Sequence, residues 1–125
     1  MTKFQSLFED FESALLRLDE VLKEKKTAFI RDAAIKRFEI AFDLAWKTTK
    51  AFLEQHHNIS CVSPKTCFRE AHRVALIEYD VEWLKLADYR NYTAHTYREE
   101  LAEKVYQELP AALEMFRKLH AVLEQ

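Results

Sequence analysis

Glycine is absent from this sequence of 125 residues, and proline occurs only at Pro64 and Pro110. The glycine-rich phosphate loops of P-loop and Rossmann proteins are therefore excluded. Tight hairpins that need Asn-Gly or Gly-X at the turn are excluded for the same reason. Both absences argue against the common nucleotide-binding α/β folds and against a small all-β fold.

Cysteine and long apolar runs are also scarce. Cys61 and Cys67 are the only cysteines, and without a secretory context we predict that both are reduced thiols. No apolar run approaches the roughly 20 residues that span a bilayer. The start Met1-Thr2-Lys3-Phe4 lacks the apolar core of a signal peptide. We therefore expect a cytoplasmic protein with no membrane segment.

The composition that remains is that of a globular domain, with 49% apolar and 32% charged residues. A chain of this length buries roughly two-thirds of the surface that its unfolded form exposes. We expect one domain over residues 1–125 that folds without a disulfide, a metal or a cofactor. The net charge of -2 predicts no bulk attraction to nucleic acid, although a local basic site stays open.

Apolar residues recur every three or four positions along most of the chain, which is typical of amphipathic helices. The second predicted helix has apolar residues on two adjoining stripes, so we expect neighbours on most of its sides. Its narrow polar stripe holds opposite charges four residues apart. Predicted helices run from Phe4 to Leu22, from about Phe29 to Gln55, and from Pro64 to about Leu76.

A fourth helix follows Asp80 as its N-cap and runs into residues 88–99. Thr96 and Glu99 form a capping-box pattern, which predicts that the last helix begins at Tyr97. Pro110 should kink or restart this helix. The predicted fold class is all-α, an antiparallel up-and-down four-helix bundle with an additional short helix.

Residues 88–99 concentrate the reactive side chains of the chain. Arg90 is a fixed cation suited to phosphate, His95 can move protons near neutral pH, and Tyr97 carries a phenol. A helix start beside an arginine favours an anion. We therefore predict phosphate chemistry, in which His95 moves a proton during metal-independent RNA cleavage while Arg90 and Asn91 hold the phosphate. A two-fold dimer would supply a second histidine.

Plainer interpretations of these residues stay open. Arginine, asparagine and histidine at a helix junction often serve only as capping and salt-bridging groups. Lys47, Lys50, Arg69 and Arg73 could form a basic rim for RNA. The competing interpretation is an ordinary solvated face, in which the lysines pair with Asp43 and Glu54. Trp46 and Trp83 fit a core or a dimer interface better than base stacking. A zinc site would need ligands from a set whose spacings match no compact zinc finger: His56, His57, Cys61, Cys67 and His72.

Residues 90–95 resemble the signature of the HEPN superfamily of helical bundles, which consists of an arginine, a polar residue, a short spacer and a histidine. They are similar in particular to the HepT-like branch, also described as nucleotidyltransferase substrate-binding proteins, whose pattern continues His-x-Tyr. The residues that carry the resemblance cover most of the chain: Arg90-Asn91-Tyr92-Thr93-Ala94-His95-Thr96-Tyr97, Arg31 to Glu39, Trp46-Lys47, Ser63-Pro64-Lys65 and Phe68-Arg69.

The resemblance implies a HEPN-like homodimer whose motifs face each other across a cleft. Arg90 and His95, supported by Asn91, would cut RNA as the toxin half of a two-gene module. A small nucleotidyltransferase encoded nearby would inactivate the protein by transferring AMP from ATP to Tyr97, within a dimer or a larger hetero-complex. The alternative that the resemblance leaves open is a non-catalytic subunit that binds a substrate or nucleotide for the transferase.

Overall fold

The computed structural model describes residues 1–124, which form α-helices and one short three-ten helix with no strand. This confirms the predicted all-α class. The elements in chain order are α1 (Lys3–Leu22), α2 (Ala28–His57), α3 (Pro64–Arg73), α4 (Val81–Tyr92), the three-ten helix η1 (Thr93–His95) and α5 (Glu99–Leu123).

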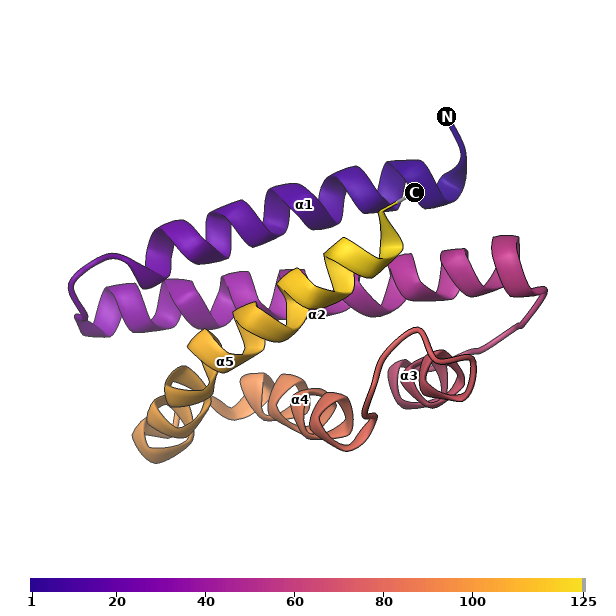
Figure 1. The fold of residues 1–125 in the computed structure, drawn as a ribbon. Helices are drawn as coiled ribbons and strands as arrows, with labels where there is room; N and C mark the ends of the chain where they lie inside the picture. The colour runs from indigo at the N-terminus through magenta and orange to yellow at the C-terminus, as the bar shows by residue number, and fades with distance from the viewer. Residues whose placement is uncertain (125) are drawn as a thin grey trace.

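Helix α2 is the centre of the fold, as its two apolar stripes predicted. It contacts each of the other four α-helices and η1. Figure 1 shows α1 and α2 lying side by side and antiparallel, with α5 crossing them obliquely and α3 and α4 on the other side of α2. Thr2 caps α1 and Thr27 caps α2, each accepting a backbone N–H from the residue three positions later.

An aromatic cluster joins four of these helices in the core. Phe68 of α3 stacks on Trp83 of α4 with ring centroids 4.5 Å apart, and Trp83 lies 5.9 Å from Phe116 of α5. Phe116 in turn lies 6.1 Å from Phe38 of α2. All four side chains are buried. Trp83 is therefore a core residue, and Trp46 is a half-buried side chain packed against the core.

The third helix is shorter than predicted, because the chain leaves it at Arg73 and not at Leu76. The N–H of Ala75 donates to the carbonyl of His72, and the N–H of Leu76 donates to the carbonyl of Ala71. These two bonds form a Schellman motif, whose left-handed residue is normally glycine. Here Ala75 takes that role with a φ of 63°. Only Asn58, after α2, shares this conformation among the described residues.

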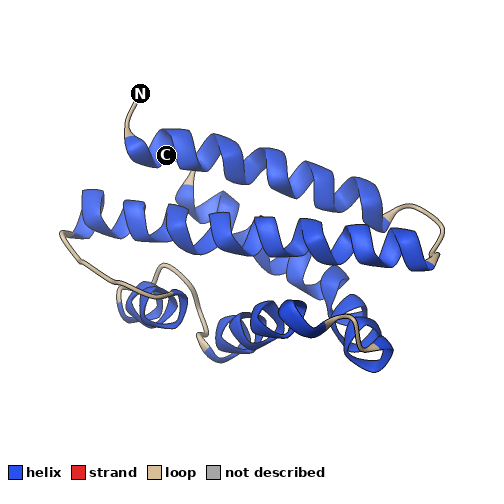
Figure 2. Cartoon of the chain, turned by 180° about the vertical axis from the view of Figure 1, so that it is seen from behind, coloured by secondary structure: helices blue, strands red, loops and turns tan. Residues whose placement is uncertain are grey.

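Pro110 lies inside α5 without ending it, since the helix continues from Glu99 to Leu123. The ribbon of α5 changes direction along its length in Figures 1 and 2, as expected of a helix kinked by proline. Asp80 is the N-cap residue of α4 as predicted, but its side chain makes no capping hydrogen bond.

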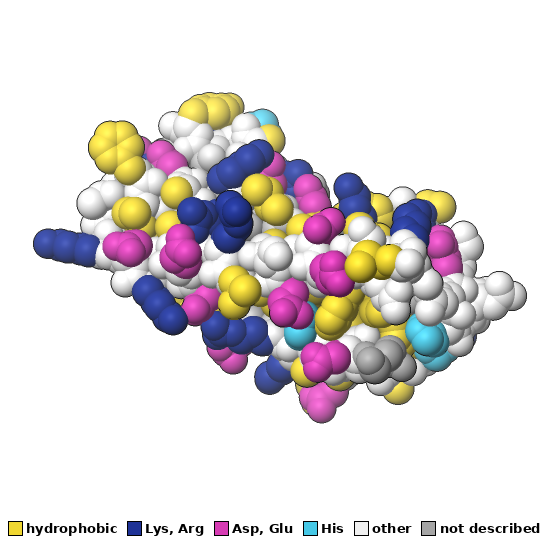
Figure 3. Space-filling model, turned by 90° about the horizontal axis from the view of Figure 1, so that it is seen from above, with side chains coloured by type: hydrophobic (Ala, Val, Ile, Leu, Met, Phe, Trp, Pro, Cys, Tyr) yellow, Lys and Arg dark blue, Asp and Glu magenta, His cyan; other side chains and the backbone are white. Residues whose placement is uncertain are grey.

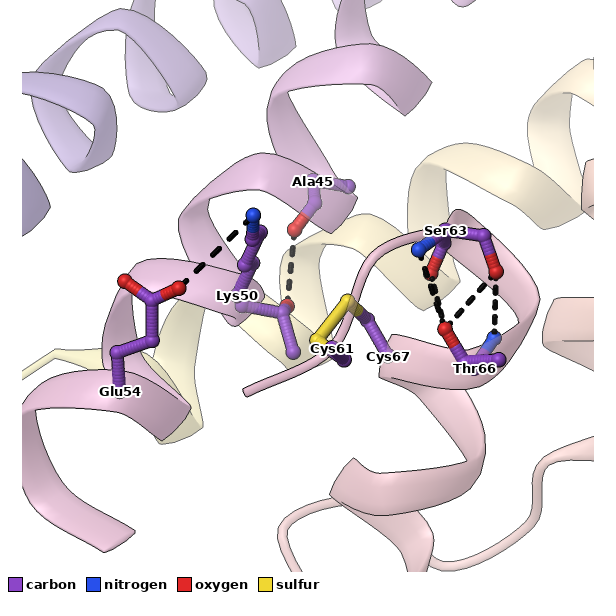
Figure 4. The surroundings of a disulfide bond; sticks show 8 residues. Ala45, Lys50, Glu54, Cys61, Ser63, Thr66 and Cys67 are labelled. Carbon is purple, nitrogen blue, oxygen red and sulfur yellow. Dashed lines mark hydrogen bonds and ion pairs between the residues drawn. A yellow bond between two sulfur atoms is a disulfide. The ribbon is translucent and has the colours of Figure 1, made fainter. Parts of the chain in front are cut away.

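Cys61 and Cys67 form a disulfide, so the prediction of reduced thiols was wrong. Asn58 turns the chain back at the end of α2, and Cys61 then meets the first turn of α3 with its Cα 5.2 Å from that of Cys67. That separation lies within the usual range for bonded cysteines. Figure 4 shows the bond beside the Ser63 and Thr66 side chains, which cap α3 reciprocally.

The start of α1 and the end of α5 lie at the same end of the molecule. Met1 and Glu124 accordingly line the same shallow pocket. Figure 3 shows basic and acidic side chains interspersed over the face seen from above. None of the described helices is long and apolar enough to cross a bilayer.

Candidate functional site

The connection between α4 and α5 is where the sequence placed its reactive residues. Helix α4 ends at Tyr92, and the backbone continues in a helical conformation through η1 before α5 begins at Glu99. The predicted capping box at Thr96 was wrong. Thr96 has a φ of -76° and a ψ of 4°, which is not the extended conformation of an N-cap, and its hydroxyl donates to the carbonyl of Thr93 at 3.2 Å.

Arg98 is the N-cap residue of α5 instead, and its side chain makes no capping bond. Its own N–H donates to the carbonyl of His95 at 3.1 Å. Tyr97 therefore lies in the turn that precedes α5, not in the first turn of the helix. Its side chain is 76% exposed, so the phenol lies in solvent.

Arg90, in the last turn of α4, is held by an acidic residue of α2. Its Nε and Nη2 donate to the two carboxylate oxygens of Asp43 at 3.0 and 3.1 Å. Its Nη1 donates to the hydroxyl of Thr93 at 3.0 Å, and Glu39 lies 3.6 Å from Nη2. The hydrogen bonds to Asp43 raise the pKa of the Arg90 guanidinium further above its already high value. Arg90 is therefore a permanent and firmly oriented cation.

The polar stripe of α2 thus has a role that the sequence interpretation missed. Asp43 was expected to pair with Lys47 on a solvated face, but it faces α4 and pairs with Arg90. Burial alone would raise the pKa of Glu39, but the hydrogen bond from Lys36 and the charge of Arg90 outweigh it and lower that pKa. The four-residue spacing of Glu39 and Asp43, which puts two carboxylates on one helix face, was the available signal.

A groove of about 390 Å³ opens beside Arg90. Lys65 contributes a second cation to its wall, although its Nζ lies 2.9 Å from the Oδ1 of Asp88. The groove combines donors, acceptors and a small apolar floor. Its lining residues come from α2, the start of α3 and α4: Phe42, Asp43, Ser63, Pro64, Lys65, Ala87, Arg90 and Asn91.

His95 and Tyr97 form a second pair just beyond this groove. The Tyr97 hydroxyl lies 3.4 Å from Nδ1 of His95, and the two rings meet edge to face with centroids 6.0 Å apart. Both side chains are exposed. Neither residue is among those that line the groove. The structure thus groups Arg90 with Asn91 and His95 with Tyr97, without joining the two groups in one pocket of a single chain.

The start of α5 is fixed to α2 by a buried arginine. Arg31 is only 5% exposed, and its Nη1 donates to Glu99 at 2.6 Å and to Glu103 at 3.0 Å. The Arg31 guanidinium lowers the pKa of Glu99, while Lys26 and then Arg31 lower that of Glu103. Glu99 and Glu100 occupy the first turn of α5, so the positive end of its dipole is already complemented. The helix start predicted to attract an anion therefore carries carboxylates of its own.

Several of the basic residues and possible zinc ligands singled out from the sequence are explained by bonds to residues close to them in the chain. Arg73 is paired with Glu70 at 2.7 Å and Lys50 with Glu54 at 3.8 Å, which fits a solvated face of paired charges. The disulfide commits both cysteines of the zinc hypothesis to each other.

Comparison with known proteins shows the same architecture elsewhere. The chain matches the family described as "Nucleotidyltransferase substrate binding protein like" over residues 6–125. A Haemophilus influenzae protein described as a probable ribonuclease HepT is 36% identical over 80 residues. That alignment covers 61% of this chain and 55% of the relative, so the chain spans about half the length of the curated relative it matches.

Two solved structures resemble the whole chain. A crystal structure of a Thermus thermophilus protein superposes with a TM-score of 0.87 at 34% identity, covering 92% of this chain and 99% of that one. A Haemophilus influenzae protein, described as having the fold of a substrate-binding domain of a nucleotidyltransferase, superposes with a TM-score of 0.70 at 24% identity. Here the match covers 98% of this chain and 97% of the other, and it establishes the likeness of the folds.

Proposed function

Because the chain belongs to the nucleotidyltransferase substrate-binding protein-like family, a grouping consistent with HepT-like HEPN proteins, we propose that it acts beside a small nucleotidyltransferase. In this proposal the chain is a HEPN-type ribonuclease that cuts RNA without a metal ion, as the toxin half of a two-component module. Arg90, Asn91 and His95 form the catalytic site, and Tyr97 accepts AMP from the partner. The protein works in the cytoplasm as a homodimer or within a larger complex with the transferase.

The proposed cleavage is an attack by the RNA on itself. An imidazole of His95 takes the proton of a 2'-hydroxyl, whose oxygen attacks the adjacent phosphorus, and the bond from phosphorus to the 5'-oxygen breaks. A protonated His95 returns a proton to the leaving oxygen, which gives a cyclic 2',3'-phosphate and a free 5'-hydroxyl. Arg90 stabilises the charge that builds on the phosphate oxygens, and Asn91 helps to place the phosphate.

The observation that carries this proposal is the contact between His95 and Tyr97. Because Nδ1 of His95 lies 3.4 Å from the Tyr97 hydroxyl, Nε2 is the ring nitrogen left to meet a substrate. In the modification, the Tyr97 oxygen attacks the α-phosphorus of ATP, loses its proton and displaces pyrophosphate. The resulting phosphodiester stands against the imidazole and brings a negative charge to the place that an RNA phosphate would use. One contact thus accounts for both activity and inactivation.

The proposed dimer follows from the separation of the two groups of residues. Arg90 and Asn91 line the groove, whereas His95 lies outside it. A two-fold arrangement that sets the junction of one copy against that of the other brings two arginines and two histidines to one phosphate. The second histidine provides separate groups for the base and the acid.

Cleavage of single-stranded RNA in EDTA tests the ribonuclease. Purified wild type should cut the RNA, and His95→Ala should lower the rate by about 10²- to 10⁴-fold, the usual contribution of a general acid or base. His57→Ala, which removes an exposed histidine at the end of α2, is the matched control and should cut at the wild-type rate. Tyr97→Phe loses the AMP acceptor and the hydroxyl beside Nδ1 but keeps His95, so its rate should exceed that of His95→Ala. Equal, negligible cleavage by wild type and His95→Ala would reject this function.

Mass spectrometry tests the modification. Incubation with the partner transferase and ATP should add AMP to the wild type but not to Tyr97→Phe. The modified wild type should lose RNA cleavage, and Tyr97→Phe should keep it under the same treatment. AMP found on Tyr97→Phe would place the acceptor elsewhere.

A second candidate is a non-catalytic subunit that binds a substrate or nucleotide for the transferase. It is favoured by the acidic partners that Arg90 already has, since Asp43 and Glu39 offset its positive charge beside the groove. Calorimetric titration of the purified protein with ATP tests it. Binding that weakens in Lys65→Ala, together with absent RNA cleavage by the wild type, would favour this candidate over the ribonuclease.

A further inference from the structure

We propose that Asp43 is a positioning residue that fixes the guanidinium of Arg90 for its contact with the RNA phosphate. This inference rests on the proposed ribonuclease function and names a residue outside the Arg-to-His motif. Asp43 lies on α2, 47 positions before Arg90 in the sequence, and acts only through that arginine.

The contact uses one complete edge of the guanidinium. Nε and Nη2 donate in parallel to the two oxygens of Asp43, and Nη1 donates to Thr93. A guanidinium has five N–H groups in a fixed plane. Three are thus engaged in hydrogen bonds, which leaves one N–H on Nη1 and one on Nη2, with Glu39 at 3.6 Å from Nη2 as an ion-pair partner. Two N–H groups on neighbouring nitrogens are the donors of a bidentate phosphate contact.

The elements behind Asp43 are rigid. Asp43 follows Phe42, which is 1% exposed in the core, and it lies in the middle of the longest helix of the fold. Thr93 is 9% exposed, and its hydroxyl also donates to the carbonyl of Arg90 at 2.6 Å. Arg90 itself has a long side chain with many rotamers, so without these partners its charge would sample many orientations. Asp43 and Thr93 restrict it to one orientation at the wall of the groove.

A purely structural salt bridge between α2 and α4 is the competing explanation. It predicts that loss of Asp43 lowers the unfolding temperature while the folded variant keeps its cleavage rate. A positioning role predicts that the folded variant loses rate, and that nothing further is lost once Arg90 is absent, because Asp43 acts on the phosphate only through Arg90. Thermal unfolding and a double-mutant cycle on the rate separate the two explanations.

The experiment measures single-turnover RNA cleavage and thermal unfolding for the wild type, Asp43→Asn, Arg90→Ala and the double variant. Asp43→Asn should lower the rate on the order of 100-fold, the scale associated with misplacing a catalytic group by about 1 Å. It should cause no further loss in Arg90→Ala. Asp43→Glu should recover part of the rate, since it restores a carboxylate. Asp19→Asn, which removes a carboxylate 2.9 Å from Arg117 between α1 and α5, should leave the rate unchanged.

A wild-type rate in folded Asp43→Asn, or an equal loss in both the wild-type and the Arg90→Ala backgrounds, would overturn the proposal. If Asp43→Asn does not fold, Thr93→Val removes the third hydrogen bond with little change of shape. It should lower the rate about tenfold, roughly the loss of one hydrogen bond to a charged group, and only when Arg90 is present. A loss that persists in Arg90→Ala would again overturn the proposal.

Arginine side-chain NMR separates failure of this inference from failure of the proposed function. The Nε–H signal of Arg90, assigned by its absence from Arg90→Lys, should exchange slowly with water in the wild type and rapidly in Asp43→Asn. That result supports the positioning contact even if the wild type cuts no RNA, in which case the ribonuclease proposal fails by itself. Unchanged exchange in Asp43→Asn would show that Asp43 does not hold Arg90.

Discussion

Ala75 carries a backbone conformation that usually belongs to glycine, in a sequence that contains no glycine. The left-handed region brings the Cβ atom of an alanine too close to the following carbonyl oxygen, at a cost of roughly 1–2 kcal/mol. Asn58, the other such residue, tolerates the region better because its short polar side chain can form local hydrogen bonds. The alanine is therefore a point of strain at the end of α3.

Ala75→Gly should raise the free energy of unfolding by about 0.5–1 kcal/mol. The strain removed from the folded state is larger than the free energy that the unfolded chain gains from the greater backbone freedom of glycine. Ala111→Gly is the matched control, since Ala111 is an exposed residue inside α5. The same substitution there should lower the free energy of unfolding by about 1 kcal/mol. Urea unfolding measures both, and equal signs for the two variants would contradict the interpretation.

Arg31 should make the stability depend on pH. Glu99 and Glu103 have lowered pKa values in the folded protein, so their contribution is complete above the ordinary glutamate pKa of about 4.3. It is lost as the pH falls through their lower folded values. Acidification from pH 5 to pH 3 should therefore lower the Tm of the wild type more than that of Arg31→Met.

Arg73→Met is the control for this comparison. Arg73 pairs with Glu70 within the exposed part of α3, where solvent weakens the interaction. The variant Arg73→Met should therefore show the same dependence of Tm on pH as the wild type. Parallel curves of Tm against pH for Arg31→Met and the wild type would show that the pairing of Arg31 with Glu99 and Glu103 does not cause the pH dependence.

The sequence could identify single reactive residues but only some of their partners. Arg90, His95 and Tyr97 stand out by residue type and close spacing. The pairing of Arg90 with Asp43 joins residues far apart in the chain, and it depends on how α4 packs against α2. Periodicity shows that Asp43 lies on a polar stripe, but it does not show which neighbour that stripe faces.

At the scale of the helix, the packing of α3 against the core determines where one wall of the groove lies. α3 is only 10 residues long, too short to be stable alone, and it is held by Phe68 against Trp83 and Phe42. Lys65 and Ser63 reach the groove from the start of this helix. The core contact of Phe68 thus determines where these groove residues lie.

Phe68→Ala should lower the free energy of unfolding by about 3–5 kcal/mol, because it leaves a cavity where a fully buried ring stood. Phe29→Ala removes the same side chain from a position that is 87% exposed, and it should change stability by no more than about 0.5 kcal/mol. Denaturant unfolding compares the two. Similar losses for both would mean that Phe68 is not a core residue in solution.

Helix existence followed from periodicity, whereas helix ends depended on local backbone conformation. Five α-helices lie close to where the apolar repeats placed them. The errors lie at the start of α5 and at the end of α3. A Thr-x-x-Glu pattern caps a helix only if its threonine is extended, and Thr96 is not, because η1 continues the helical path of α4. At Ala75 no glycine marked the Schellman motif.

At the scale of the whole molecule, the disulfide is the feature that the amino-acid composition did not predict. Two cysteines six positions apart say nothing about whether the chain between them turns back, and here it does. The closed segment contains Ser63, Pro64 and Lys65, which form one wall of the groove. The oxidation state of the cysteines thus bears on both stability and the shape of the site.

Removal of this disulfide should lower the free energy of unfolding by about 2 kcal/mol, the loop-entropy contribution of so short a ring. Guanidinium unfolding of the wild type with and without dithiothreitol measures it. The variant Cys61→Ser/Cys67→Ser should match the reduced wild type and show no response to the reductant. An identical midpoint for the wild type in both conditions would mean that the thiols are already reduced in solution.

The start of α1 and the end of α5 lie at one end of the fold, where Met1 and Glu124 line one pocket, while the junction between α4 and α5 lies at the opposite end. A short flexible linker can therefore join the ends, and new ends can be opened in the exposed connection 23–27 between α1 and α2. Such a circular permutant keeps every helix intact. It makes α2 the first helix of the chain and α1 the last, so the central antiparallel pair would form between the two extremes of the reordered sequence.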